Sequence, residues 1–227
     1  MEHPFTWFGA LGVPEKYQFF ATSILVMVVL CALAARARAA LQTDAAIVPD
    51  PGVSVRNLFE LLTEAIADLA KAVIGHHSES YVPLFCSFFV FIVVANLLGL
   101  VPGFSPPTSN FNITFALGTV SFLAFNYFGF KALGVRYLKS FVGPVWWLAV
   151  LMVPLELISS FVRPLSLALR LFGNLFGDHL VLEIFTDLTK VGVPVVFYML
   201  GTMVSVIQAF VFTLLSMIYI ALAVHEH

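Results

Sequence analysis

Long apolar stretches dominate this chain, and short polar segments separate them. The main stretches cover residues 17–40, 82–101, 112–131, 144–188 and 195–222. About 20 consecutive apolar residues are enough for a helix to cross the hydrocarbon core of a bilayer. The pattern predicts an all-α integral membrane protein with about five membrane-embedded helices, because helices satisfy their own backbone groups in lipid. We expect residues 1–227 to form a single membrane domain.

Residues 54–76 follow a different pattern from the five apolar stretches. Apolar residues recur there at helical spacing: Leu58, Leu62, Ala65, Leu69 and Val73. The charged residues Glu60, Glu64, Asp68 and Lys71 fall largely on the other side. This is typical of an amphipathic helix that lies on the membrane surface or packs against a partner. The segment therefore predicts an interfacial helix rather than a span.

The stretch 144–188 is too long for an upright span. As one helix it would be roughly 67 Å long, against about 30 Å of hydrocarbon. Arg163-Pro164 is the one place where a turn would fit, but a proline inside a helix kinks it more readily than it ends it. We expect one long, tilted and kinked helix, followed by a long partner over 195–222 in a helical hairpin.

The distribution of basic residues predicts the orientation. Arg36, Arg38, Arg56 and Lys71 flank the interfacial helix, and Lys131, Arg136 and Lys139 lie in the next basic connection. The connection at 102–112 is uncharged, and the one at 186–194 has the single basic residue Lys190. The positive-inside rule then predicts a cytoplasmic C-terminus and an N-terminus outside. Because the arginines follow the first stretch rather than precede it, that stretch is expected to be an uncleaved span.

Composition agrees with a membrane protein and excludes other classes. The 227 residues are 60% hydrophobic and 11% charged, whereas an ordinary globular domain has about 25% charged residues. The net charge of −2 argues against a nucleic-acid partner. Cys31 and Cys86 lie inside apolar stretches, so we interpret them as buried small hydrophobic residues. No nucleotide loop, zinc-protease motif or nucleophile–base pair is present, so we expect no catalytic site, metal or cofactor.

A row of polar residues runs through the longest apolar stretch. Its members, spaced by three or four residues, are Glu156, Ser159, Arg163, Ser166, Arg170, Asn174 and Asp178. On a helix they occupy roughly 120° of the circumference. A charge at the centre of a bilayer costs at least about 2.5–3.5 kcal/mol, so this polar stripe should face a cavity, a partner or its own members.

Small and polar residues accompany the polar stripe. Gly173 and Gly177, four residues apart, would let another helix approach closely. The last apolar stretch has a weaker row of its own: Thr202, Ser205, Gln208, Ser216 and Tyr219. The two helices are therefore expected to line a polar path together.

Arg170 lies midway along the polar stripe and is the one member that cannot give up its proton. It is therefore a poor relay, but a good electrostatic barrier and docking site for a mobile carboxylate. An interhelical lock to backbone carbonyls is the alternative. For Arg163 a structural role is favoured: its side chain could reach the membrane interface or pair with Glu156. Gln208, considered by itself, would suit a hydrogen bond between helices.

Several motifs together resemble subunit a of F-type ATP synthases. They are PLSLALRLFGN at 164–174, IQAFVFTLLSMIYIALAVHEH at 207–227, ANLLGLVPG, PTSNFNIT and PLELISSFVRP. The resemblance covers nearly the whole chain. The resemblance implies a proton-translocating stator subunit, a component of the ATP synthase complex. The implied partners are a rotating ring of c subunits, the peripheral stalk subunit b, the lipid bilayer and protons. A bacterial inner membrane is the expected location.

The resemblance also implies roles for individual residues. Two offset half-channels would load and unload carboxylates on the c-ring. Arg170 would pair with the ionised ring carboxylate and block a direct leak. Asn174 and Gln208 match positions that line the path beside the arginine, and Glu156 matches an acid of the cytoplasmic half-channel. Ser166, Ser205 and Glu183 are secondary candidates, together with Arg163.

The chain departs from many relatives in the far-side half-channel. Those relatives have Glu where this chain has His179, and His on the last helix where this chain has Gly201. The far-side half-channel is therefore expected to use Asp178 and His179, both of which can titrate. A self-contained secondary transporter or channel is the alternative function, but such a protein would usually show repeated halves, and none is visible here.

Overall fold

The computed structural model describes residues 6–41, 54–75, 78–134, 137, 149–189 and 192–225. Within these residues all regular structure is helical. Four of the described helices are long and apolar enough to cross a membrane: Lys16–Arg38, Phe111–Leu133, Val150–Thr186 and Gly192–Val224, with Val82–Leu98 as a shorter apolar helix. The predicted all-α membrane fold is confirmed. Residues 144–148, Arg136, Lys139 and Lys190, on which parts of the predictions rest, lie outside the described residues.

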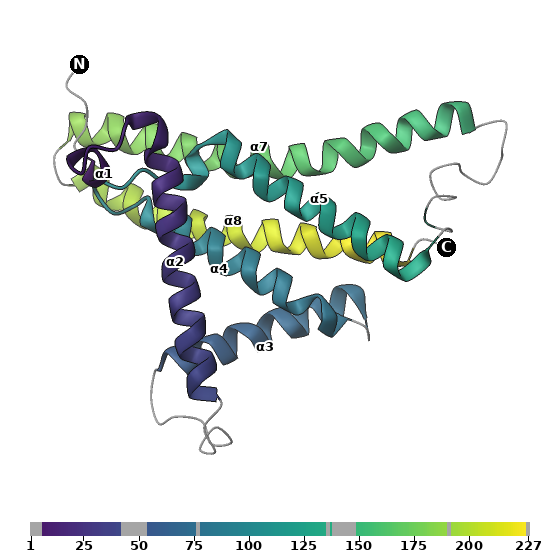
Figure 1. Ribbon diagram of the computed structural model, residues 1–227. Helices are drawn as coiled ribbons and strands as arrows, with labels where there is room; N and C mark the ends of the chain where they lie inside the picture. Colours follow the sequence, from purple (N-terminus) through teal and green to yellow (C-terminus); the bar gives the residue numbers. More distant parts are fainter. Residues whose placement is uncertain are drawn as a thin grey trace. The chain divides into compact units, whose positions relative to one another are not determined.

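The chain divides into two compact units, residues 1–107 and 108–227. The first unit contains α1 (Trp7–Ala10), α2 (Glu15–Leu41), α3 (Val55–Ile74), the short turn η2 (Ser78–Ser80) and α4 (Val82–Leu98). Helix α2 contacts α1, α3 and α4, and α3 packs on α4 (Figure 1). The helices at 54–76 and 82–101 expected from the sequence thus lie together in this unit.

Helix α1 is held at the loop that follows α4. The hydroxyl of Thr6 caps α1 by accepting a hydrogen bond from the backbone N–H of Gly9. The backbone N–H of Trp7 donates to the carbonyl of Gly103 across 3.0 Å, and its indole Nε1 donates to the carbonyl of Pro102 across 3.2 Å. These bonds join the start of the chain to a segment about 95 residues away.

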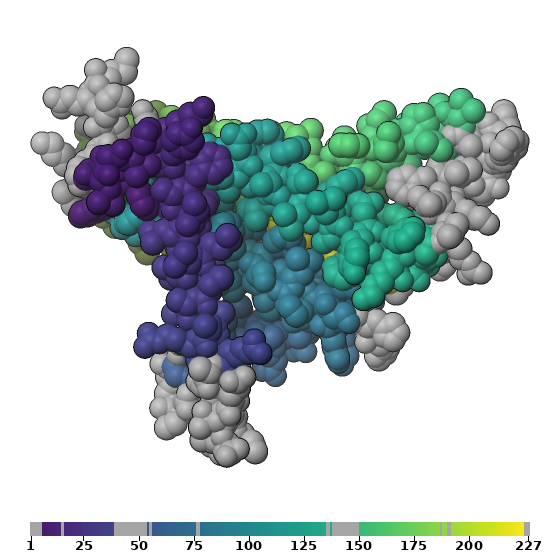
Figure 2. Space-filling view, in the orientation of Figure 1, coloured from purple at the N-terminus to yellow at the C-terminus, as the bar shows by residue number. Residues whose placement is uncertain are grey.

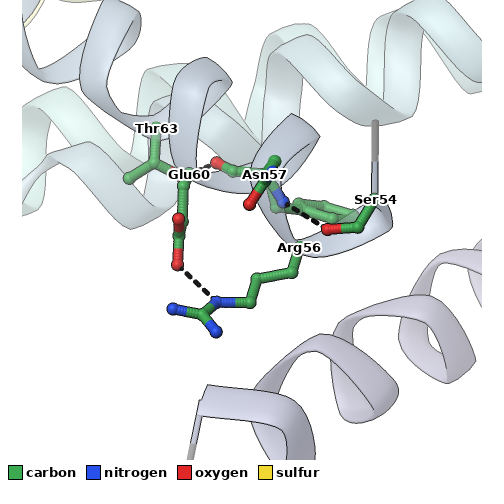
Figure 3. A network of polar contacts seen from close by, with 6 residues as sticks. Ser54, Arg56, Asn57, Glu60 and Thr63 are labelled. Atoms are coloured by element: carbon green, nitrogen blue, oxygen red, sulfur yellow. Dashed lines mark hydrogen bonds and ion pairs between the residues drawn. The ribbon is translucent and has the colours of Figure 1, made fainter. Parts of the chain in front are cut away.

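Helix α3 has well-defined ends and one buried apolar side. The hydroxyl of Ser54 accepts the first free N–H, from Asn57, and Gly75 ends the helix with a φ of 93° that favours glycine. Figure 3 shows this cap beside the ion pair of Arg56 and Glu60, whose Nε and Oε1 atoms are 2.8 Å apart. The buried side contains Ile66, Ala70 and Ile74. On the predicted apolar side, Leu58 and Ala65 are exposed and Leu62, Leu69 and Val73 are half-buried, so the buried side lies next to the predicted one.

Protein covers α2 on one side only. Thr22 and Val26 are buried, whereas Ile24 and Val28 are each 60% exposed, and α2 is visible along its length in Figure 2. An exposed apolar side of this length suits contact with lipid. Cys31 lies in an exposed position and Cys86 is half-buried, and both are free thiols. The prediction that Cys31 is buried is therefore wrong, because a residue in an apolar stretch can face lipid instead of protein.

The second unit contains α5 (Phe111–Leu133), α7 (Ala149–Leu188) and α8 (Gly192–His225), and the short turn η3 (Pro107–Ser109) spans the division between the units in the sequence. Helices α7 and α8 form an antiparallel hairpin, and α5 packs against both (Figure 1). Pro154 and Pro164 lie inside α7, which continues through both of them. One long helix therefore occupies the described part of the stretch 144–188.

Close packing of α5 fixes the second unit around Pro164. A Cβ atom added to Gly118 would lie 2.6 Å from the carbonyl oxygen of Pro164, so this contact requires glycine. One turn further along α5, the hydroxyls of Ser121 and Ser216 are 2.9 Å apart in a buried hydrogen bond between α5 and α8. Small residues and interhelical hydrogen bonds are the usual means by which membrane helices associate.

Candidate polar path on the α7–α8 hairpin

All seven residues of the polar stripe lie on α7, beside the surface that α7 buries. The buried surface contains Leu167, Ala168, Leu171 and Leu175. Along the stripe, Ser159, Arg170 and Asn174 are exposed, and Glu156, Arg163, Ser166 and Asp178 are half-buried. The stripe thus follows the edge of the helix–helix contact, where polar groups can reach both the neighbouring helix and the outside of the unit.

Asn174 is the stripe residue that bonds directly to α8. Its Nδ2 donates a hydrogen bond to Oε1 of Gln208 across 2.7 Å. Gln208 is 5% exposed, so its side chain lies within the unit rather than on its surface. The two amides that were predicted to line one path from different helices are therefore joined.

Arg163 contacts both neighbouring helices. Its Cζ lies 5.9 Å from the ring centroid of Phe125 on α5 and 5.6 Å from that of Tyr219 on α8. Its Nη2 is 3.9 Å from Oε1 of Glu156, so the suggested pairing of these two residues is present. Arginine over an aromatic face is a favourable arrangement when the ring centroid is within about 6 Å.

Three contacts define the register of α7 against α8. From the turn outward they are the stacked rings of Phe185 and Phe197, the amide pair of Asn174 and Gln208, and the cation–π pair of Arg163 and Tyr219. Each contact is 11 residues from the next on both helices. Eleven residues complete three turns at about 3.67 residues per turn, so the same side of each helix meets its partner repeatedly. We call these three contacts the hairpin rungs.

Arg170 differs from every rung residue. It lies on the exposed part of the polar stripe, between Arg163 and Asn174. Among the described residues it has no hydrogen-bond, ion-pair or aromatic partner. Its charge is therefore not balanced by any group in the described part of the chain.

Asp178 and His179 lie nearer the turn of the hairpin. Oδ2 of Asp178 and Nε2 of His179 are both buried, and neither has a hydrogen-bond partner among the described residues. A buried polar atom without a partner is costly and usually indicates a functional site or bound water. Glu183, one turn further on, is exposed.

Other sequence candidates are located as follows. Ser205 is buried on α8, and Ser166 is half-buried on α7. A methyl group added to Gly173 or Gly177 would have no neighbour within 4 Å among the described residues. The close helix partner that these glycines suggested is therefore not found in the described part of this chain.

Sequence reasoning missed the partner of Ser216. Ser121 on α5 bonds to it, and Thr114, Gly118 and Ser121 are all buried on the same side of α5. Their spacing of four and three residues could have predicted this interface, because small and weakly polar residues at helical spacing indicate a contact between membrane helices. Ser160, which is 4% exposed, adds a buried hydroxyl to α7 beside the stripe.

The first unit contains a cavity. It has a volume of about 410 Å³ and is lined by Ala37, Arg56, Phe59, Glu60, Thr63, Glu64 and Ala67. Its lining is mostly apolar and contains no predicted site residue. In the described part of the chain, no three His, Cys, Asp or Glu residues are grouped so as to hold a metal ion. The polar stripe and the hairpin rungs remain the candidate site.

The helices and the site together define a class of protein. Long apolar helices with apolar exposed sides, and polar residues concentrated on one hairpin, identify a multi-pass α-helical membrane protein. The ATP synthase A chain family matches residues 19–221. The chain belongs to this family.

Relatives from bacteria cover almost the same length. ATP synthase subunit a of Bdellovibrio bacteriovorus is 48% identical over 219 residues, which are 95% of this chain and 96% of that protein. ATP synthase subunit a of Trichlorobacter lovleyi is 45% identical over 205 residues, 90% of this chain and 85% of that protein. The corresponding subunit of Oleidesulfovibrio alaskensis is 37% identical over 212 residues, 93% of this chain and 87% of that protein. The resemblance drawn from the sequence motifs is confirmed.

Proposed function

We propose that this chain is the proton-translocating stator subunit of an F-type ATP synthase and acts as one membrane domain beside a rotating c-ring. Two offset aqueous half-channels load and unload the ring carboxylates. The chain has no catalytic site of its own, and the peripheral stalk subunit b holds it against rotation. The membership of the ATP synthase A chain family supports this proposal.

The observation that carries the proposal is that the Arg170 charge has no partner among the described residues. A permanent charge on an apolar helix is expensive unless a partner compensates it. The described residues offer Arg170 no partner, although its neighbour on the stripe, Arg163, has three. A mobile carboxylate on another protein meets this need. Arg170 then holds the ionised ring carboxylate and blocks a direct leak between the half-channels.

Each half-channel is assigned to one end of the stripe. Glu156 belongs to the cytoplasmic half-channel, and Asp178 and His179 belong to the far side, with Glu183 near its mouth. The buried, unbonded Oδ2 and Nε2 atoms support the far-side assignment, because buried titratable atoms without a hydrogen-bond partner are typical of a functional site. Asn174 and Gln208 line the path beside Arg170.

The glycines beside Arg170 support an external helix partner. Added methyl groups at Gly173 and Gly177 would meet nothing within 4 Å among the described residues. Glycines in a membrane helix allow a neighbouring backbone to come close. A c-subunit helix approaching at these positions would bring its carboxylate within reach of Arg170.

The decisive experiment measures ATP-driven acidification of inverted membrane vesicles that contain Arg170→Ala in the assembled complex. We expect pumping to be abolished while the complex still assembles. Arg38→Ala, an exposed arginine on α2, is the control and should pump normally. Normal pumping by Arg170→Ala would contradict the proposal. So would ion transport by the purified chain reconstituted alone, which is the behaviour of a self-contained transporter.

A further inference from the structure

The two arginines of the polar stripe are seven residues apart and have different surroundings. Arg170 is exposed and lacks partners among the described residues. The Arg163 side chain is 25% exposed and contacts residues on α5, α7 and α8. Arg163 therefore has a fixed place in the unit, and its role requires a separate explanation.

Aromatic rings from two helices hold the guanidinium of Arg163. Phe125 is 2% exposed and is completely enclosed by the unit. Its ring centroid is 6.2 Å from that of Tyr219, and the guanidinium lies within 6 Å of both. Attraction between a cation and an aromatic face grows when the pair is shielded from water. The two rings therefore restrict the guanidinium to the junction of three helices.

Glu156 is the third partner of Arg163, two turns earlier on α7. The 3.9 Å between Nη2 and Oε1 is too long for a hydrogen bond, although the opposite charges still attract. The Glu156 side chain is 36% exposed, and no described residue forms a hydrogen bond with it. The guanidinium therefore attracts the Glu156 carboxylate, whose oxygens remain accessible to water.

We propose that Arg163 is a positioning residue for Glu156. The ring faces of Phe125 and Tyr219 hold the guanidinium, and the guanidinium holds the Glu156 carboxylate at the polar stripe with its oxygens free to exchange protons with water. Arginine suits this task because it keeps its own proton and does not compete in the transfer. The inference rests on the function proposed above, in which Glu156 belongs to the cytoplasmic half-channel.

A double-mutant cycle in the assembled complex tests this role. ATP-driven pumping by inverted vesicles is measured for Arg163→Gln, Glu156→Gln and the double variant. Each single change should lower the initial rate, and Arg163→Gln should cause no further loss when Glu156→Gln is already present. A purely structural Arg163 would give independent losses that multiply. Multiplying losses, or normal pumping by Glu156→Gln, would overturn the inference.

We call the two ring faces of Phe125 and Tyr219 the aromatic clamp, and its contribution is tested at Tyr219. Tyr219→Leu removes the ring face and should lower pumping by about fivefold, the effect expected from losing one partly shielded cation–π contact. Tyr219→Phe keeps the ring, so its pumping rate should fall clearly less than that of Tyr219→Leu. The Tyr219→Leu loss should also disappear in the Glu156→Gln background. Equal losses of pumping in Tyr219→Leu and Tyr219→Phe would overturn the role proposed for the rings. So would a loss in Tyr219→Leu that persists when Glu156→Gln is present.

Two controls separate the possible failures. The amount of complex in each vesicle preparation is measured first, and if Arg163→Gln does not assemble, the cycle of Tyr219→Leu with Glu156→Gln takes its place as the test. Arg170→Ala is measured in parallel. If Arg170→Ala abolishes pumping while the losses at Arg163 and Glu156 multiply, only the positioning role fails. If Arg170→Ala pumps normally, the proposed function itself fails.

Discussion

Nδ2 of Asn174 donates a hydrogen bond to Oε1 of Gln208 across 2.7 Å, between residues 34 positions apart on the two arms of one hairpin. This bond is the middle hairpin rung, with the ring stack of Phe185 and Phe197 on one side and the pair of Arg163 and Tyr219 on the other. It fixes the register in which Arg170 is presented, four residues from the bond.

Replacing Gln208 with Leu should weaken the middle rung without removing the hairpin. A hydrogen bond between membrane helices contributes on average about 0.6 kcal/mol and at most about 1.7 kcal/mol. We therefore expect Gln208→Leu to reduce ATP-driven pumping by about three- to eighteenfold, whereas Arg170→Ala abolishes it. Ile207→Leu, at an exposed neighbouring position, is the control and should pump normally. A complete loss in Gln208→Leu would show that Gln208 does more than hold the register.

Asp178 and His179 should act as one unit in proton transfer. Oδ2 of Asp178 and Nε2 of His179 are both buried and lack hydrogen-bond partners among the described residues, and we propose that both serve the same half-channel. Alanine at both positions should reduce pumping more than either single change, but by less than the product of the single losses. The same vesicle assay measures this, with Thr186→Ala at an exposed site on α7 as control. Losses that simply multiply would mean that the two residues act independently.

Gly118→Ala should destabilise the second unit. The new methyl group would lie 2.6 Å from the backbone carbonyl oxygen of Pro164, and backbone atoms cannot move aside cheaply. Overpacking of this kind typically costs about 1–3 kcal/mol. The thermal unfolding midpoint of the detergent-solubilised complex should fall. Gly192→Ala, where the methyl group would meet nothing within 4 Å among the described residues, should leave the midpoint unchanged or slightly higher. Equal midpoints for the two variants would contradict the proposed tight contact.

Much of the site was predictable because it depends on local spacing. Residues three or four positions apart share a side of a helix, so Glu156, Arg170 and Asp178 could be placed on one stripe from the sequence. The suggested pairing of Arg163 and Glu156 was also within reach, because both lie on α7. The aromatic partners of Arg163 could not be predicted from the sequence, since Phe125 is 38 positions away along the chain.

The sequence by itself determined the class of protein. Stretches of about 20 apolar residues leave the backbone few alternatives to a membrane helix, and the arginine motif indicated the family. The sequence could not determine which side of an apolar helix is covered by protein, as the exposed Cys31 demonstrates. Lipid and protein interior are both apolar, so composition does not distinguish them.

Only the tertiary structure decided the register of α7 against α8 and the fit of α5 against both. Apolar helices can slide past one another with little change in buried area, so a few specific contacts select one alignment. Here they are the hairpin rungs, the bond of Ser121 with Ser216 and the contact of Gly118 with Pro164. These contacts secure Arg163 between two rings and leave Arg170, on the same stripe, without a partner among the described residues. The sequence provides two arginines on one side of a helix, and packing between distant segments gives them different surroundings.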